Sequence, residues 1–444
     1  MIHTSLSVIR ARRDKHARGV GLEGVIVESV AAGSIVDRRS VVSLMSRLRS
    51  SRGQSNPYPI YAELRAMGDV VPAPWGGYLL LSHDICDHVL RSKKWSTFDA
   101  EWRARQGDVN RWNAPAARQL SQTLQGLNPP VHTMQRRSLG NIFDRFTLDT
   151  LEEPVSRIAD TLLDRLGEQL RTTKEADFAT TVGEEMPAAT ISHWLRLPES
   201  DHDLLKSLTH GQGLAQELLP SKSQLAQANE AAEGLRTYFT EVIRERRQNL
   251  GDDVLSDWIR TWDEIEPDRA LADETLYHLV MFIVIASMET TSTLLSNMVW
   301  LLDQHPGSMG WLRSHPDRIP QAVEEVLRYD PPIHLTTRVA TEDTILSGFR
   351  ISRDEVVHVM LGAANHDPAH HTDPDTFDIL RTGSHLGFGG GIHYCIGAAL
   401  ARLEAVVLLK SLVRRFPTLR VTAPPVWEPR VAFRRLTALH VTER

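Results

Sequence analysis

The most apolar part of the chain, residues 276–302, constrains the fold more than any other segment. It contains the run LVMFIVIASM and is long enough to cross the hydrocarbon core of a lipid bilayer. Glu289 lies near its centre, however, with serine and threonine residues around it. Because an ionisable side chain that faces lipid is costly, the segment is predicted to be a helix buried inside a protein. No membrane partner is expected.

Helical periodicity dominates residues 131–312, with apolar side chains at intervals of three and four in TLDTLEEPVSRIADTLLDRL and AAEGLRTYFTEVIRERR. Short strand candidates cluster later, in TRVATEDTILSGFRISRDEVVHVML and at the C-terminus. The absence of a regular strand and helix alternation disfavours a doubly wound nucleotide-binding fold. The pattern therefore predicts a mainly α fold with small β-sheets. The mildly acidic net charge of -6 gives no reason to expect nucleic acid as a partner.

Residues 1–53 differ from the rest of the chain in charge, with about ten Lys or Arg against four Asp or Glu and little amphipathic periodicity. We predict a basic, disordered N-terminal extension over residues 1–53 and one folded domain over residues 54–444. A translation start at Met45 is an alternative interpretation. Only Cys86 and Cys395 are present, and no stretch near the N-terminus has the pattern of a secretion signal, so a cytoplasmic location is expected.

The glycine-rich stretch GFGGGIHYCIG, residues 387–397, raises the question of what its thiol does. A phosphate-binding loop would need Gly-Lys-Ser/Thr at its end. Zinc could be held by His385, His393 and Cys395, but their spacing fits no common zinc pattern, and a nucleophilic cysteine would need a base that the sequence does not nominate. A thiolate in a turn that offers backbone N–H donors and precedes a helix suits one soft metal bond. Haem iron with an axial cysteine satisfies that description.

This stretch resembles the haem-binding pattern of the cytochrome P450 family, Phe-x-x-Gly-x-His/Arg-x-Cys-x-Gly. The resemblance covers residues 54–444 and is to soluble bacterial members. It implies the cytochrome P450 fold, with haem b held between the helix that carries Ala286 and a loop in which Cys395 ligates the iron. The residues matching the pattern are Phe388, Gly391, His393, Cys395 and Gly397.

The segment from Ala286 to Thr291 resembles the family's oxygen-side motif Ala-Gly-x-Asp/Glu-Thr-Thr. The resemblance implies that Glu289 and Thr290 deliver protons to bound dioxygen, in a helix that opens locally. Serine at position 287, where glycine is usual, is a departure. It could narrow the oxygen groove or change a hydrogen bond.

The segment EEVLR resembles the family's Glu-x-x-Arg element, which implies that Glu325 and Arg328 form a structural pair that supports folding and haem incorporation. The family's third partner is commonly an arginine just before the Phe of a later segment. Thr376 occupies that position here, so either Arg381 replaces the missing arginine or the pair has lost one charge partner.

Positions that approach the haem propionates in the family correspond here to His132, Arg136, Arg338 and His385. Candidate substrate contacts come from residues 96–127, 204–219, 333–336 and 431–433. The individual candidates are Phe282, Ile333, His334, Leu335, Val431 and Ala432.

The resemblance implies a monomeric haem-thiolate monooxygenase that uses O2 to hydroxylate or otherwise oxidise a small organic molecule, in natural-product biosynthesis or in xenobiotic or catabolic oxidation. Electrons would come from a ferredoxin and an NAD(P)H-dependent ferredoxin reductase, docking where Arg136, Arg137 or Arg402 meets an acidic surface. One alternative is a catalytically silent haem protein that acts in binding or recruitment, motivated by Ser287 and Thr376. A zinc-dependent hydrolase built on Cys395 is the other.

Overall fold

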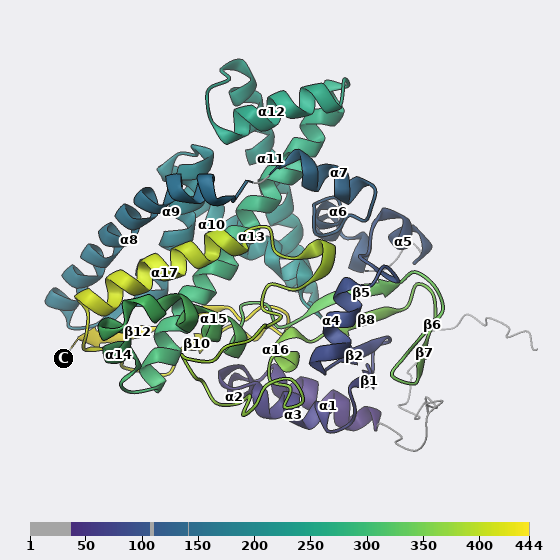
Figure 1. Cartoon of the computed structure of the whole chain (residues 1–444). Coiled ribbons are helices and arrows are strands. Elements are labelled where there is room, and N and C mark those ends of the chain that lie inside the picture. Colours follow the sequence, from purple (N-terminus) through teal and green to yellow (C-terminus); the bar gives the residue numbers. More distant parts are fainter. Residues whose placement is uncertain (1–36, 107–110, 141, 444) are drawn as a thin grey trace, which may run out of the picture.

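Helices dominate the computed structural model, which describes residues 37–106, 111–140 and 142–443. Figure 1 shows the long helices α8, α13 and α17 on one side of the molecule and the largest sheet on the other. The helices are α1 (Arg38–Leu48), α2 (Ser51–Ser55), α3 (Tyr58–Arg65), α4 (His83–Arg91), α5 (Ala100–Arg105), α6 (Pro115–Ser121), α7 (Val131–Ser138), α8 (Arg145–Thr173), α9 (Glu185–Leu195), α10 (His202–Gly213), α11 (Lys222–Gln248), α12 (Val254–Ile265), α13 (Arg269–Gln304), α14 (Ser308–Ser314), α15 (Ile319–Tyr329), α16 (Leu361–Ala364) and α17 (Ala398–Arg415).

The strands form small sheets, as the sequence predicted. The largest sheet has the order β1-β2-β8-β5-β3, with β2 and β8 parallel and the other neighbours antiparallel. A second sheet has the order β4-β12-β9, and β6-β7 and β10-β11 are two-stranded. The strands are β1 (Val70–Pro72), β2 (Tyr78–Leu80), β3 (Trp95–Ser96), β4 (Ala176–Asp177), β5 (Thr336–Ala340), β6 (Thr344–Leu346), β7 (Phe349–Ile351), β8 (Val356–Val359), β9 (Leu419–Val421), β10 (Val426–Trp427), β11 (Leu436–Ala438) and β12 (His440–Glu443).

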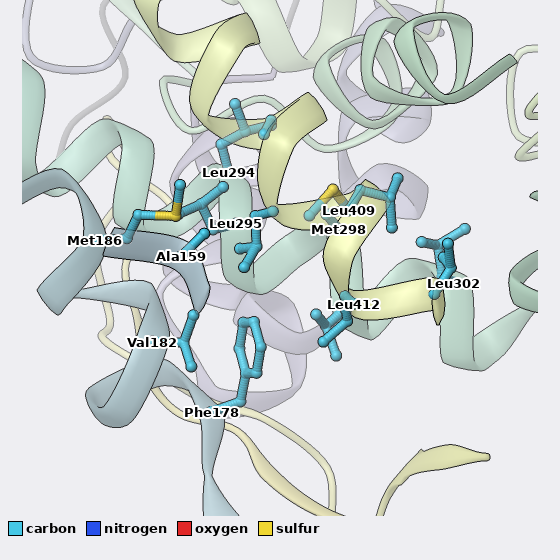
Figure 2. Close-up of a cluster of buried hydrophobic side chains, with 14 of the residues drawn as sticks. Ala159, Phe178, Val182, Met186, Leu294, Leu295, Met298, Leu302, Leu409 and Leu412 are labelled. Atoms are coloured by element: carbon cyan, nitrogen blue, oxygen red, sulfur yellow. The ribbon is translucent and has the colours of Figure 1, made fainter. Parts of the chain in front are cut away.

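Helix α13 is the central element of the core. It is long and apolar enough to cross a membrane, but 78% of its most apolar window is buried inside the protein, which is typical of a core helix. Figure 2 shows Leu294, Leu295 and Met298 of α13 in the cluster that also contains Leu409 and Leu412 of α17. Residues 269–304 form one unbroken α-helix, so the local opening implied by the resemblance is not seen. The polar residues near the middle of α13 are therefore held in place by a continuous helix.

Helices α1 and α2 correct the predicted domain boundary. The Asp37 side chain accepts hydrogen bonds from the first backbone N–H groups of α1, and Val41, Leu44, Met45 and Leu48 are buried in a cluster with α3. The charge count concealed this apolar stripe, whose spacing is that of one helix face. The prediction of a disordered extension is therefore wrong for residues 38–53. Residues 1–36 lie outside the described residues.

Candidate functional site

A cavity of about 320 Å³ brings α13 and the Cys395 loop together. Its walls contain most of the site residues predicted from the sequence. They are Phe282, Ala286, Glu289 and Thr290 from α13, His132 and Arg136 from α7, Ile333, Leu335 and Arg338 around β5, and Phe388, His393, Cys395 and Gly397 from the loop. Residues 97, 98, 112 and 120, from the loop region predicted to contact substrate, also line it.

The loop holds the Cys395 thiol toward the cavity. The Cys395 backbone N–H donates to the Phe388 carbonyl oxygen at 3.1 Å, which closes the turn. Burial raises the pKa of the Cys395 thiol, and a hydrogen bond from the Gly397 backbone N–H opposes this shift. The turn therefore supplies the kind of N–H donor that the sequence predicted, and a metal ion would complete the stabilisation of the thiolate.

Gly391 serves the loop in a different way from the predicted cofactor contact. It has a positive φ of 65°, and a Cβ there would lie 2.1 Å from the Leu90 carbonyl oxygen of α4. It does not line the cavity. Glycine is required because the loop packs against the backbone of α4 at this point.

Basic side chains gather on one wall of the cavity without acidic partners. Arg338 is buried, and its guanidinium donates to the Thr337 carbonyl oxygen at 2.8 Å and to the Thr336 hydroxyl at 3.3 Å. Within the described residues it forms no ion pair, and burial lowers its pKa to about 10. The His132 Nε2 is buried without a hydrogen-bond partner, and the His132 and His393 rings lie 4.5 Å apart.

This basic wall fits an anionic ligand. A buried guanidinium without a counter-charge is costly, so the fold is stabilised when an anion enters. Burial, followed by Arg338 and His132, lowers the pKa of His393 to about 3, which keeps its ring neutral. Haem b combines two carboxylates with an iron that takes a thiolate ligand, and the residues present match both requirements.

The polar centre of α13 also lines the cavity. The Thr290 hydroxyl donates to the Ala286 carbonyl oxygen at 2.7 Å, and the Ser287 hydroxyl donates to the Ile283 carbonyl oxygen at 2.5 Å. Both hydroxyls thus bond to the carbonyl four residues earlier. The serine that departs from the family pattern is satisfied within its own helix.

Glu289 belongs to a buried network that the sequence did not reveal. Its carboxylate accepts a hydrogen bond from Arg430, whose Nε donates to Glu217 at 3.0 Å. Burial raises the pKa of Glu289, and the Arg430 charge opposes this shift. No local motif could have identified this network, because Arg430 lies 141 positions from Glu289 and 213 from Glu217.

Besides Gly391, four residues predicted to contact haem or substrate lie away from the cavity wall. The backbone N–H groups of Val431 and Ala432 donate to Glu217 at 2.8 and 3.2 Å, so these residues hold a carboxylate and do not line the cavity. His334 is fully buried between the Tyr61 hydroxyl at 2.8 Å and Asp330 at 3.1 Å.

His385 is the fourth. Its Nε2 lies 3.1 Å from a Glu324 oxygen and the residue does not line the cavity, so its approach to a propionate stays a prediction that this structure does not support. Arg402 donates to the same carboxylate at 2.6 and 2.8 Å. Of the arginines predicted to meet a redox partner, Arg136 faces the cavity and Arg402 pairs with Glu324, whereas Arg137 is exposed and forms no ion pair with any described residue.

Glu325 and Arg328 form the predicted buried pair, with two hydrogen bonds of 2.7 and 2.8 Å. Arg381 supplies the third member, because its Nε donates to Glu325 at 3.2 Å. Arg381 and Arg328 both also donate to the Thr376 carbonyl oxygen. Arg381 therefore takes the place of the arginine that position 376 lacks, and it also holds the backbone at that position.

Comparison with known proteins agrees with this geometry. The family model described as cytochrome P450 matches residues 104–433. The putative cytochrome P450 140 of Mycobacterium tuberculosis is 32% identical over 382 residues, which cover 82% of this chain and 84% of that protein. The cytochrome P450 monooxygenase PikC of Streptomyces venezuelae is 33% identical over 399 residues, covering 88% and 92%.

Solved structures give the same result. P450BioI in complex with an acyl carrier protein ligated to hexadec-9Z-enoic acid has a TM-score of 0.80 at 30% identity, covering 88% of this chain and all of that one. The biotin biosynthesis cytochrome P450 of Bacillus subtilis is 31% identical over 409 residues, covering 90% and 100%. The chain belongs to the cytochrome P450 family. It is a cytochrome P450 monooxygenase of the bacterial type.

Proposed function

We propose that this monooxygenase oxidises a small organic molecule in natural-product biosynthesis, with electrons from a ferredoxin and an NAD(P)H-dependent ferredoxin reductase. The observation that carries the proposal is that Glu289 and Thr290 on α13 share one cavity with the Cys395 thiol. The names of two relatives, a biotin biosynthesis P450 and the monooxygenase PikC, support a biosynthetic role. The cytoplasmic location and the monomeric state stay predictions.

The residues around the cavity have separate roles toward haem b. Cys395 would hold the iron through Sγ, and Arg338, Arg136 and His132 would bind the propionates. Phe388 and Ala286 would face the two sides of the ring. When bound, the haem supplies the activation of dioxygen, because a thiolate ligand pushes electron density toward O–O cleavage.

The protein's own part in the reaction is to hold and move protons. Glu289 is buried, and burial raises the pKa of its carboxyl group against the opposing charge of Arg430, so this carboxyl group holds a proton more readily than an exposed glutamate does. Thr290 Oγ1 already donates to the Ala286 carbonyl, which leaves its lone pairs as acceptors toward the cavity. When the hydroxyl turns from the Ala286 carbonyl toward the cavity, Oγ1 can give its proton to an acceptor there and take another from a neighbouring donor.

Ser287 and Thr376 are the two departures from the family pattern that favoured a silent haem protein, and the structure accounts for both. Ser287 bonds within α13 and leaves Glu289 and Thr290 in place. Arg381 completes the ion-pair group that Thr376 left open. The monooxygenase proposal therefore needs no special assumption about either position.

The cavity walls support a largely apolar, partly aromatic substrate. Phe98, Trp112, Phe282 and Phe433 line it together with aliphatic side chains. The partly buried Arg111 also lines it and donates to the Glu217 carbonyl oxygen at 2.8 Å, so part of the wall is polar. We infer a substrate with an apolar body and a polar group.

Product analysis with a reconstituted ferredoxin and reductase tests the proposed function. Spectral shifts on addition of library metabolites identify candidate substrates first. Incorporation of an oxygen atom from labelled O2 into one of them is the expected result. Haem-loaded protein that binds metabolites and consumes no NAD(P)H above background with any of them would instead favour the silent haem protein.

Thr290→Ala is expected to lower product formation by about 10²-fold while NAD(P)H consumption falls much less, because the hydroxyl that passes the proton is lost. The ratio of product to NAD(P)H consumed is the measurement. Thr290→Ser keeps the hydroxyl and is expected to recover much of this ratio. Equal ratios in Thr290→Ala and the unaltered protein would contradict the role of the hydroxyl.

Arg338→Leu is expected to speed haem loss about 10- to 100-fold, because a charge-assisted hydrogen bond contributes roughly 1.5–3 kcal/mol. Haem transfer to an excess of an apo-globin gives the dissociation rate without any measurement of activity. Arg350→Leu, at an exposed position on β7, is the matched control and should leave this rate unchanged. Equal rates in both variants would remove Arg338 from the propionate site.

A further inference from the structure

A cluster of histidines lies on the surface apart from the haem cavity. His83 and Asp84 begin helix α4, and His370 lies in the turn of residues 367–371. One ligand atom from each of these side chains lies within 4.8 Å of the others. All three also line a surface depression that shares no residue with the haem cavity. The cluster therefore takes no part in the function proposed for the haem cavity.

The state of the His83 side chain is the second observation. It is only 6% exposed, and neither of its ring nitrogens has a hydrogen-bond partner. The nearest carboxylate oxygen, that of Asp84, lies 3.7 Å from Nδ1. A buried ring nitrogen without a partner is costly, and a metal ion would satisfy it.

Asp367 fixes the two segments relative to one another. Its carboxylate accepts a hydrogen bond from the His83 backbone N–H at 2.8 Å and another from the Ala369 N–H at 3.0 Å. Its backbone carbonyl accepts from the N–H groups of His370 and His371. One buried residue thus holds α4 and the turn together, so the ligand atoms are brought near one another before any ion binds.

The rings themselves are arranged compactly. The His83 and His370 rings stack with centroids 3.3 Å apart, and the His371 ring is edge-on to both. The buried His371 Nε2 also has no hydrogen-bond partner.

We propose that His83, Asp84 and His370 form a binding site for a borderline divalent transition-metal ion such as Zn²⁺. Two imidazoles and one carboxylate select such an ion over Ca²⁺ or Mg²⁺, which prefer oxygen ligands. Tetrahedral zinc needs its ligand atoms about 3.3 Å apart, so the ligands must close by about 1–1.5 Å. Asp84 and His370 are exposed and can make this movement around the fixed His83, and the His370 ring must also turn out of its stack with His83, because a bound ion lies in the plane of each imidazole ring.

The ion would clip the first turn of α4 to the turn of residues 367–371. Helix α4 also supplies the Leu90 carbonyl against which Gly391 packs. The site is therefore structural. It would stabilise helix α4, against which the Cys395 loop packs, without any contact with the haem. Binding to the folded state alone stabilises that state.

Zinc binding to the haem-loaded, tag-free protein tests the proposal. After treatment with a chelator and desalting, calorimetric titration with Zn²⁺ and metal analysis after dialysis are expected to show one bound equivalent. The melting temperature should rise, and the haem absorption spectrum should stay unchanged because Cys395 is not involved. Ca²⁺ at the same concentration should not compete.

Variants at the exposed ligands keep the test independent of folding. His370→Gln and Asp84→Asn are each expected to weaken zinc binding by about tenfold or more, since each removes one ligand. His440→Gln, at an exposed position on β12, is the matched control and should bind zinc as the unaltered protein does. No bound zinc, or equal affinity in His370→Gln and the unaltered protein, would overturn the proposal.

Discussion

Cys395→His is expected to abolish substrate oxidation and to replace the thiolate-type band of the reduced, carbon monoxide-bound protein with a histidine-type band. The reason is electronic, because a neutral imidazole does not donate electron density to the iron as a thiolate does. The loop offers room for the exchange, since the Cys395 side chain faces the cavity. Absorption spectroscopy and product analysis on the same preparation measure both effects.

Cys86 provides the matched control, because it is the other cysteine of the chain. It is fully buried on α4, and its Sγ donates to the Leu80 carbonyl oxygen at 3.4 Å. Cys86→Ala is expected to keep the thiolate-type band and the activity while losing about 1 kcal/mol of stability. A thiolate-type band that persists in Cys395→His, or that disappears in Cys86→Ala, would refute the assignment of the ligand.

The features that the sequence revealed are those whose chemistry is local. Cys395 and Gly397 lie in one short loop, and their relation depends on a turn that the glycines make possible. The burial of α13 could also be predicted from neighbouring residues, because the apolar composition of the helix suits a membrane whereas the ionisable Glu289 at its centre does not. In both cases the residues that constrain one another are close in sequence.

The features that the sequence concealed depend on distant segments or on side-chain direction. Glu217 and Arg430 meet only because the chain returns to α13 after many other elements. His334 and His385 have the right chemistry for ligand contacts, but the sequence carries no information on which way each ring turns. The structure directs them to Asp330 and Glu324 instead. Chemical type alone is therefore a weak guide to site membership.

The error at the N-terminus has a different physical cause. Charge composition describes the exposed side of a helix, whereas order depends on the apolar stripe that it buries. In α1 the basic residues face solvent while Val41, Leu44 and Leu48 pack into the core. A count of charges averages over both faces and misses the stripe.

Glu325→Gln is expected to destabilise the protein by about 3–5 kcal/mol, because it leaves the buried Arg328 and the partly buried Arg381 without their counter-charge. Glu325 and Arg328 are almost fully inaccessible to solvent, and Arg381 adds a second cation 3.2 Å away. The urea concentration at half unfolding, followed by circular dichroism and haem absorbance, measures the change.

Glu63 offers a control of the same chemistry at the surface. Arg47 donates two hydrogen bonds to it, at 2.7 and 2.8 Å, with the same paired geometry as Arg328 and Glu325. About half of each side chain is exposed, so water replaces the lost partner and Glu63→Gln should barely move the unfolding curve. The contrast isolates burial as the cause. Equal shifts in the two variants would mean that the Glu325 group stabilises the fold no more than an ordinary surface pair does.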